Sequence, residues 1–205
     1  MKVLVVSGSQ RTESQSAKVG EYIASVAKQF EDVEHLELCK TNLPFFDADY
    51  KAIKAEDSAW PAIEKSLKEA DAYVFITPEW SGMASPMLKN VLLMANQAHT
   101  GHKPALLVSV VAGINGAYPL AELRMNGFKN NKIVAIPDHV IVRHAANMLN
   151  EGVAKEDRDE FDQMTRDRIE FGLISLRQYG DALVGVRELK KANPYPNEKA
   201  FASGM

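Results

Sequence analysis

Apolar residues along this chain gather in five short runs, and helix-like periodicity fills the intervals between them. The short runs, some continuously apolar and some alternating, predict strands over residues 2–6, 33–38, 72–76, 104–111 and 132–136. The fifth is interrupted by Pro137 and is expected to resume over residues 139–142. Apolar residues three and four positions apart predict helices after Ser16, over 59–69, from Pro86, over 118–128 and over 159–184.

Strands that alternate with helices, and that are mostly apolar on both faces, indicate an α/β fold with a doubly wound parallel sheet. Right-handed crossovers make the flavodoxin-like order 2-1-3-4-5 the simplest arrangement of five strands. We expect residues 1–187 to form this single domain. Residues 188–205 are polar, and we expect them to be a tail that is either disordered or packed on a partner subunit.

Ligands bind such sheets outside the carboxyl ends of the strands, near the point where the strand order reverses. The segments expected there are residues 7–16, 77–86 and 112–116, which are also rich in glycine and hydroxyl side chains. Sheet topology and loop chemistry therefore indicate the same place for a binding site.

The first of these segments has the composition of a phosphate-binding loop. It surrounds one cation, Arg11, with a glycine and several hydroxyls, among them Ser9, Ser14 and Ser16, and a helix follows. Unpaired N–H groups and the dipole at a helix N-terminus favour an anion, and arginine adds a charge-assisted pair. The alternative interpretation is an ordinary helix start capped by a serine.

The absence of two known nucleotide-binding motifs limits the kind of phosphate ligand that this loop is expected to bind. The loop lacks the G-x-G-x-x-G of dinucleotide-binding folds and the G-x-x-x-x-G-K-[ST] of P-loop proteins. What remains suits a terminal phosphate monoester such as that of FMN at the first strand–helix turn.

Composition limits the function classes. The 205 residues carry a net charge of −3, which indicates neither a nucleic-acid footprint nor a polybasic membrane patch. No apolar run approaches the ~20 residues of a membrane span. Cys39 is a single cysteine, so it forms no internal disulfide, and this fits a reducing cytoplasm.

Four motifs, in order over residues 2 to about 142, resemble the NADPH-dependent FMN reductase family. Residues 8–14 are similar to its G-S-x-R-x-x-S phosphate loop, and Leu43–Asp49 to its L-P-x-[FY]-x-x-D segment. Thr77–Trp80 with Ser85–Asn90 is similar to its T-P-E-Y-N…P-x-x-L-K-N block. A glycine-containing loop after the fourth strand and a downstream Leu-Arg pair complete the resemblance.

The resemblance implies an FMN-binding flavodoxin-like reductase, usually a homodimer or homotetramer, that takes hydride from NADPH or NADH. It assigns the FMN phosphate to Ser9, Arg11, Ser14 and Ser16. It assigns the isoalloxazine ring to Pro78, Glu79, Trp80, Ser81, Gly82, Ser109 and Gly113. Four features depart from the family pattern. Trp80 replaces tyrosine, Ser81 replaces asparagine, and Gly82-Met83 changes the loop beneath the ring. Gly113-Ile114-Asn115-Gly116 stands where the family has a pair of glycines.

In such chemistry the cofactor carries the hydride and the protein supplies placement, so no catalytic acid, base or nucleophile is nominated. The expected acceptor is a free flavin, a quinone or an azo compound. One alternative is a non-enzymatic flavodoxin-like electron carrier or FMN-binding partner protein. The other is a protein that binds a phosphorylated ligand without flavin. His99-x-x-His102 has a spacing that metal ligands can use, but no cysteine or carboxylate lies nearby in the sequence, so a metal site is not expected. Asp138, His139 and His144 could suggest a catalytic triad, but no serine stands in a G-x-S-x-G motif. Arg124 is left between a subunit contact, an NADPH phosphate contact and a plain helix surface.

Overall fold

The computed structural model describes residues 1–48, 51, 53, 55–194 and 196–201. Its centre is a five-stranded parallel sheet in the order β2-β1-β3-β4-β5, which confirms the predicted fold class and strand order. The strands are β1 (Lys2–Ser7), β2 (Asp32–Glu37), β3 (Ala72–Pro78), β4 (Pro104–Val110) and β5 (Val134–Val142).

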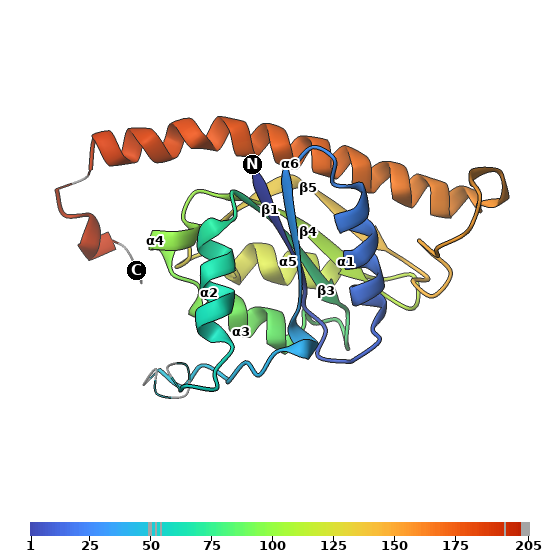
Figure 1. Cartoon of the computed structure of the whole chain (residues 1–205), viewed down its shortest axis with the longest axis horizontal. Coiled ribbons are helices and arrows are strands. Elements are labelled where there is room, and N and C mark those ends of the chain that lie inside the picture. Colours follow the sequence, from blue (N-terminus) through green and yellow to red (C-terminus); the bar gives the residue numbers. More distant parts are fainter. Residues whose placement is uncertain (49–50, 52, 54, 195, 202–205) are drawn as a thin grey trace.

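Helices cover both faces of the sheet, so that the molecule has three layers (Figure 1). One face packs against α1 (Gln15–Val26) and α6 (Glu160–Ala192). The other packs against α2 (Trp60–Glu69), α3 (Pro86–Met94) and α5 (Ala117–Asn126). The remaining helical segments are short: α4 (Gln97–Thr100) and the 3₁₀ turns η1 (Leu38–Lys40), η2 (Lys155–Asp157) and η3 (Glu198–Phe201).

The core lies on both faces of the sheet because successive side chains of a strand point in opposite directions. In β1, Val3 and Val5 pack toward α1 and α6, whereas Leu4 and Val6 pack toward α2 and α3. All four side chains are fully buried. This two-sided burial explains why the strands read as continuous apolar runs.

The predicted fifth strand is a single strand that continues through Pro137. Proline is tolerated there because β5 is an edge strand and its pairing with β4 shifts register at this point. The side chain of Arg124 on α5 reaches this irregular stretch, and its Nη2 donates to the carbonyl oxygens of Ile136, Pro137 and Asp138 at 2.7, 3.1 and 3.3 Å. Arg124 thus ties α5 to the irregular part of β5.

The last helix is longer than the sequence pattern suggested. It continues to Ala192, beyond the predicted end at Val184, and the expected domain boundary at residue 187 falls inside it. Among residues 185–192 only Val186 and Leu189 are large and apolar, but most of the others are good helix formers, and Pro194 follows. Despite this length, none of the helices in the described part of the chain is apolar enough to cross a membrane.

Candidate functional site

The three predicted loops leave the same edge of the sheet. They follow β1, β3 and β4, which are neighbours in the sheet and end at Ser7, Pro78 and Val110. Backbone hydrogen bonds extend the pairing into the loops, from Gly8 N to Ile76 O at 2.8 Å and from Glu79 N to Val110 O at 3.0 Å. The edge therefore holds the loops in fixed positions relative to one another.

Gly8 packs closely against the end of β3 and the first turn of α3. A Cβ atom here would lie 2.7 Å from Ile76 O and 2.8 Å from Leu88 Cβ, so only glycine fits. The Ser85 hydroxyl donates to Gly8 O and accepts from Leu88 N at 3.3 Å, which caps α3. One side chain thus joins the start of α3 to the first loop.

Hydroxyl groups of the first loop are arranged around the start of α1. Ser14 is the N-cap, and its Oγ accepts from Ala17 N at 3.1 Å, as in the alternative interpretation of an ordinary helix start. Ser9 is buried, and its Oγ accepts from the backbone N–H of Arg11 at 3.1 Å. Ser16 is only 1% exposed, yet its Oγ has no hydrogen-bond partner among the described residues.

A hydrogen-bond chain fixes the first turn of α1 against the sheet. Ser7 Oγ donates to Ser16 O at 3.0 Å and lies 2.8 Å from His35 Nε2. Because the Ser7 proton is used, we assign the ring proton to His35 Nε2. Burial lowers the pKa of His35, which keeps the ring neutral near pH 7.

The second loop contains a tight reverse turn. Trp80 and Met83 exchange backbone hydrogen bonds of 3.2 and 2.9 Å across Ser81 and Gly82. Both central residues have positive φ, 52° and 78°, which is the pattern of a type I′ turn. The turn holds the half-buried ring of Trp80 at the edge of the site.

Sequence reasoning missed the side chain that anchors this turn. Glu122 of α5 accepts from Ala84 N at 2.7 Å and from Lys89 Nζ at 2.7 Å. Burial acts to raise the pKa of Glu122, but these two hydrogen bonds outweigh it and the pKa is lowered. The partners are more than thirty positions apart in the chain, so no local pattern could have revealed them.

A second buried hydroxyl without a partner lies at the end of β4, just before the third loop. Ser109 is fully buried in β4, and its Oγ makes no hydrogen bond within the described part of the chain. Gly116 ends the loop with a positive φ of 101°, and a Cβ there would collide with the Ile141 side chain. This position therefore requires glycine. Gly113 is exposed and has open space around it.

The long connection after β2 is tied to the same region through Asn90. Its Nδ2 donates to Pro44 O at 2.9 Å, and its Oδ1 accepts from Phe46 N at 2.9 Å. The side chain of Asn90 thereby links the L-P-F-F segment to α3. Asp49, the last residue of that motif, lies outside the described residues.

His99 and Asp138, from the two groups not expected to form a metal site or a triad, each lie near a charged side chain. His99 Nδ1 lies 3.3 Å from the Glu64 carboxylate, and Asp138 pairs with Arg168 at 3.3 Å. Over the ranges that the structure describes, no three His, Cys, Asp or Glu side chains are grouped so that they could hold a metal ion.

The family of this chain follows from comparison with known proteins. A model of the NADPH-dependent FMN reductase family matches residues 1–147, well over half of the chain. The chain belongs to the NADPH-dependent FMN reductase family. The resemblance drawn from the four motifs is thereby confirmed.

Relatives within this family have several names. A quinone reductase of Pseudomonas putida is 30% identical over 120 residues, covering 57% of this chain and 63% of that protein. An NADPH azoreductase of Bacillus sp. (strain OY1-2) is 32% identical over 116 residues, covering 57% of this chain and 62% of that protein. The matched region thus spans less than two thirds of either relative.

Solved structures confirm the fold of this family member. FerB, a flavoenzyme NAD(P)H:(acceptor) oxidoreductase from Paracoccus denitrificans, has a TM-score of 0.68 at 21% identity, covering 88% of this chain and 97% of that one. An NADH:FMN oxidoreductase in its apo form has a TM-score of 0.66 at 13% identity, covering 86% and 88%. At these identities the likeness concerns the arrangement of strands and helices.

Proposed function

We propose that this protein is an FMN-dependent NAD(P)H oxidoreductase that reduces a small acceptor such as a quinone, an azo compound or a free flavin. The observation that carries the proposal is the pair of buried hydroxyls without partners, Ser16 Oγ and Ser109 Oγ, at the carboxyl edge of the sheet. A buried polar atom without a partner costs free energy, so a ligand that supplies one is favoured there. Family membership and the names of the relatives support the same chemistry.

The FMN phosphate is assigned to the first loop. Ser9, Ser16 and Arg11 surround the N-terminus of α1, where free N–H groups favour an anion. Ser14 uses its oxygen to cap the helix, which leaves its O–H available to donate. The donors here match what a phosphate monoester accepts, and Arg11 supplies the charge.

The isoalloxazine ring is assigned to the second and third loops. The residues in this group are Pro78, Glu79, Trp80, Ser81, Gly82, Ser109 and Gly113. The tight turn at Ser81 and Gly82 exposes backbone groups for the ring heteroatoms, and Trp80 supplies a flat apolar wall. When bound, FMN accepts and passes on hydride, so the protein's part is to orient the ring and limit its contact with water.

The reductant is NADPH or NADH, and the acceptor is a small molecule. We further propose a cytoplasmic homodimer or homotetramer, since exposed apolar side chains such as Phe171 and Leu189 on α6 are suited to a subunit contact. The competing function is a flavodoxin-like electron carrier. Carriers of that kind tend to be strongly acidic, and a net charge of −3 favours the reductase.

The visible spectrum of the purified protein, before and after anaerobic NADPH or NADH, tests the proposal. We expect flavin absorption that bleaches on addition of the reductant. Flavin that stays oxidised with both nucleotides would indicate the carrier. A protein that contains no flavin and does not bind added FMN would contradict the assignment of the site.

A further inference from the structure

A second concave surface lies next to the proposed flavin site and has no role in the assignments above. It is a cavity of about 510 Å³ at the carboxyl end of β5. Its apolar wall includes Ile114, Ile141, Met148 and Phe161, and Arg143 lies on its rim. The combination of apolar wall and single guanidinium is suited to a ring that carries an anion.

The cavity is physically joined to the third loop of the site. His144 N donates to Gly113 O at 3.1 Å, and Arg143 Nε donates to Ile114 O at 2.6 Å. Ile114 belongs both to the cavity wall and to the loop assigned to the flavin ring. A ligand in the cavity therefore lies beside the Gly113 loop.

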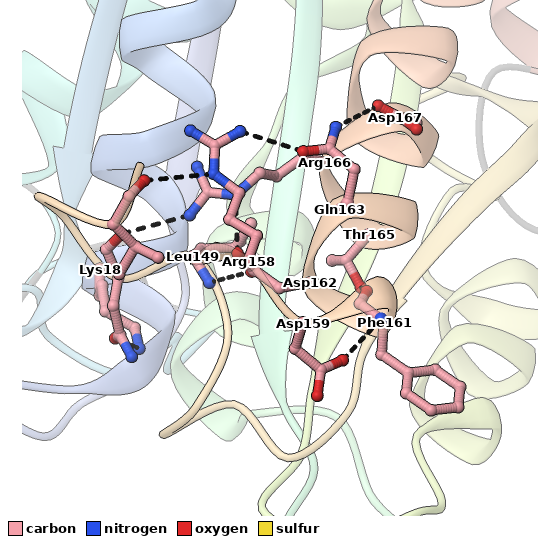
Figure 2. A network of polar contacts seen from close by, with 12 residues as sticks. Lys18, Leu149, Arg158, Asp159, Phe161, Asp162, Gln163, Thr165, Arg166 and Asp167 are labelled. Carbon is pink, nitrogen blue, oxygen red and sulfur yellow. Dashed lines mark hydrogen bonds and ion pairs between the residues drawn. The ribbon is translucent and has the colours of Figure 1, made fainter. Parts of the chain in front are cut away.

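Residues 145–150, which form one wall of the cavity, make hydrogen bonds to both α1 and α6 (Figure 2). From α1, Lys18 Nζ donates to Ala145 O and to Asn150 Oδ1, both at 2.8 Å. From α6, Asp162 Oδ1 accepts from Leu149 N at 2.6 Å. The wall is therefore built before a ligand arrives, which lowers the entropic cost of binding.

The guanidinium group of Arg143 has hydrogen-bond donors that remain available for a ligand. Its Nε is used by Ile114 O, while its terminal nitrogens have no partner among the described residues. Asp159, the carboxylate in the lining, caps α6 and accepts from Phe161 N at 2.7 Å instead of pairing with Arg143. A guanidinium oriented by its own Nε and not neutralised by a carboxylate is suited to an incoming anion.

We propose that this cavity holds the acidic end of the electron acceptor, and that the acceptor is an aromatic compound bearing a sulfonate or carboxylate. The inference rests on the proposed reductase function. The ring lies against Ile114 and Phe161, and the acidic group pairs with Arg143. For a quinone of this class, NAD(P)H and one proton give NAD(P)⁺ and the hydroquinone, and the acidic group is unchanged.

A matched pair of acceptors tests the inference: a neutral naphthoquinone and the corresponding naphthoquinone sulfonate. The measured quantity is kcat/KM for the sulfonate divided by kcat/KM for the neutral quinone. Effects common to both quinones cancel in this ratio. We expect this ratio to fall about tenfold or more in Arg143→Gln, the loss of one charge-assisted pair. Arg143→Lys, which keeps the charge, should restore part of the ratio.

Arg158→Gln is the matched control, because Arg158 precedes α6 but lines a neighbouring cavity and donates to Val153 O and Gln163 Oε1. Its ratio should equal that of the wild type. Equal loss of both quinone reactions in Arg143→Gln, or an equal fall of the ratio in Arg158→Gln, would overturn the inference.

Calorimetric titration with naphthalene sulfonate, which is not reduced, separates this inference from the proposed function. We expect weaker binding in Arg143→Gln than in the wild type, whether or not reduction occurs. Binding of equal strength to both proteins would exclude Arg143 as the anion partner. Absence of flavin and of NAD(P)H oxidation would instead contradict the proposed function.

Discussion

At the scale of single residues, Arg11 gives the most direct test of the phosphate site. Arg11 is exposed in the loop that precedes α1, and its backbone N–H donates to Ser9 Oγ. Arg11→Ala should weaken FMN binding by ~1.5–3 kcal/mol, the size of a hydrogen bond to a charged group. Titration of the apoprotein with FMN measures the change. Gln10→Ala, an exposed neighbour in the same loop, should bind FMN as the wild type does.

The surroundings of Lys103 predict that the stability of the protein depends on pH. Its Nζ donates to the carbonyl oxygens of Leu67 and Lys68, which end α2, and burial lowers its pKa from 10.5 to about 8. The unfolded chain therefore keeps a proton that the folded protein releases between pH 8 and 10.5. Stability contributed by this residue must rise with pH across that window.

Urea unfolding of the wild type and Lys103→Met, at pH values below and above 8, measures this effect. The free energy of unfolding of the wild type relative to the variant should increase with pH. Tyr73, whose ring lies 5.9 Å from Lys103 Nζ, is present in both proteins, so its own titration cancels. A difference that does not vary with pH would show that Lys103 titrates normally.

At the scale of elements, Gly20 sets how closely α1 approaches the sheet. A Cβ on Gly20 would overlap both His35 Nε2 and Ser7 Oγ. Gly20→Ala should therefore lower the free energy of unfolding by about 1–3 kcal/mol, the usual cost of overpacking, despite the higher helix propensity of alanine. Because Ser7 also holds Ser16 O, FMN affinity should fall together with stability.

Gly185→Ala is the control, since a Cβ at Gly185 of α6 meets no atom within 4 Å. There the gain in helix propensity should raise stability by about 0.5–1 kcal/mol. Thermal or urea unfolding of the two variants gives the comparison. A neutral effect of Gly20→Ala would mean that Ser7 and His35 move aside at little cost.

At the scale of the whole molecule, the sequence predicts topology better than it predicts contacts. Strand order follows from apolar runs and crossover handedness, and both are local or general properties. The sequence could also indicate Gly8 as part of the binding loop, because it directly follows a buried strand. Glu122 and Arg143 could not, since each acts on a loop distant in sequence and only folding brings them together.

The end of α6 illustrates a different reason for a wrong prediction. Beyond Val184 only Val186 and Leu189 are large and apolar, so the apolar pattern is too sparse to predict a helix there, while helix propensity continues to Ala192. After Gly180 the helix has no buried residue among those the structure describes. This part of α6 therefore adds no side chain to the buried core, and Leu189 on it is 66% exposed.

We predict that the proposed oligomer covers the exposed apolar side chains of α6. In Phe171→Glu/Leu189→Glu, two charges replace apolar groups that are 51% and 66% exposed, so an interface there would have to bury unpaired carboxylates. Light scattering after size exclusion should show a smaller assembly than for the wild type. Met125→Glu, at an 80% exposed position on α5, is the comparison and should leave the assembly unchanged. Dissociation by Met125→Glu alone would place the contact on α5, and a wild type that is monomeric would contradict the oligomer itself.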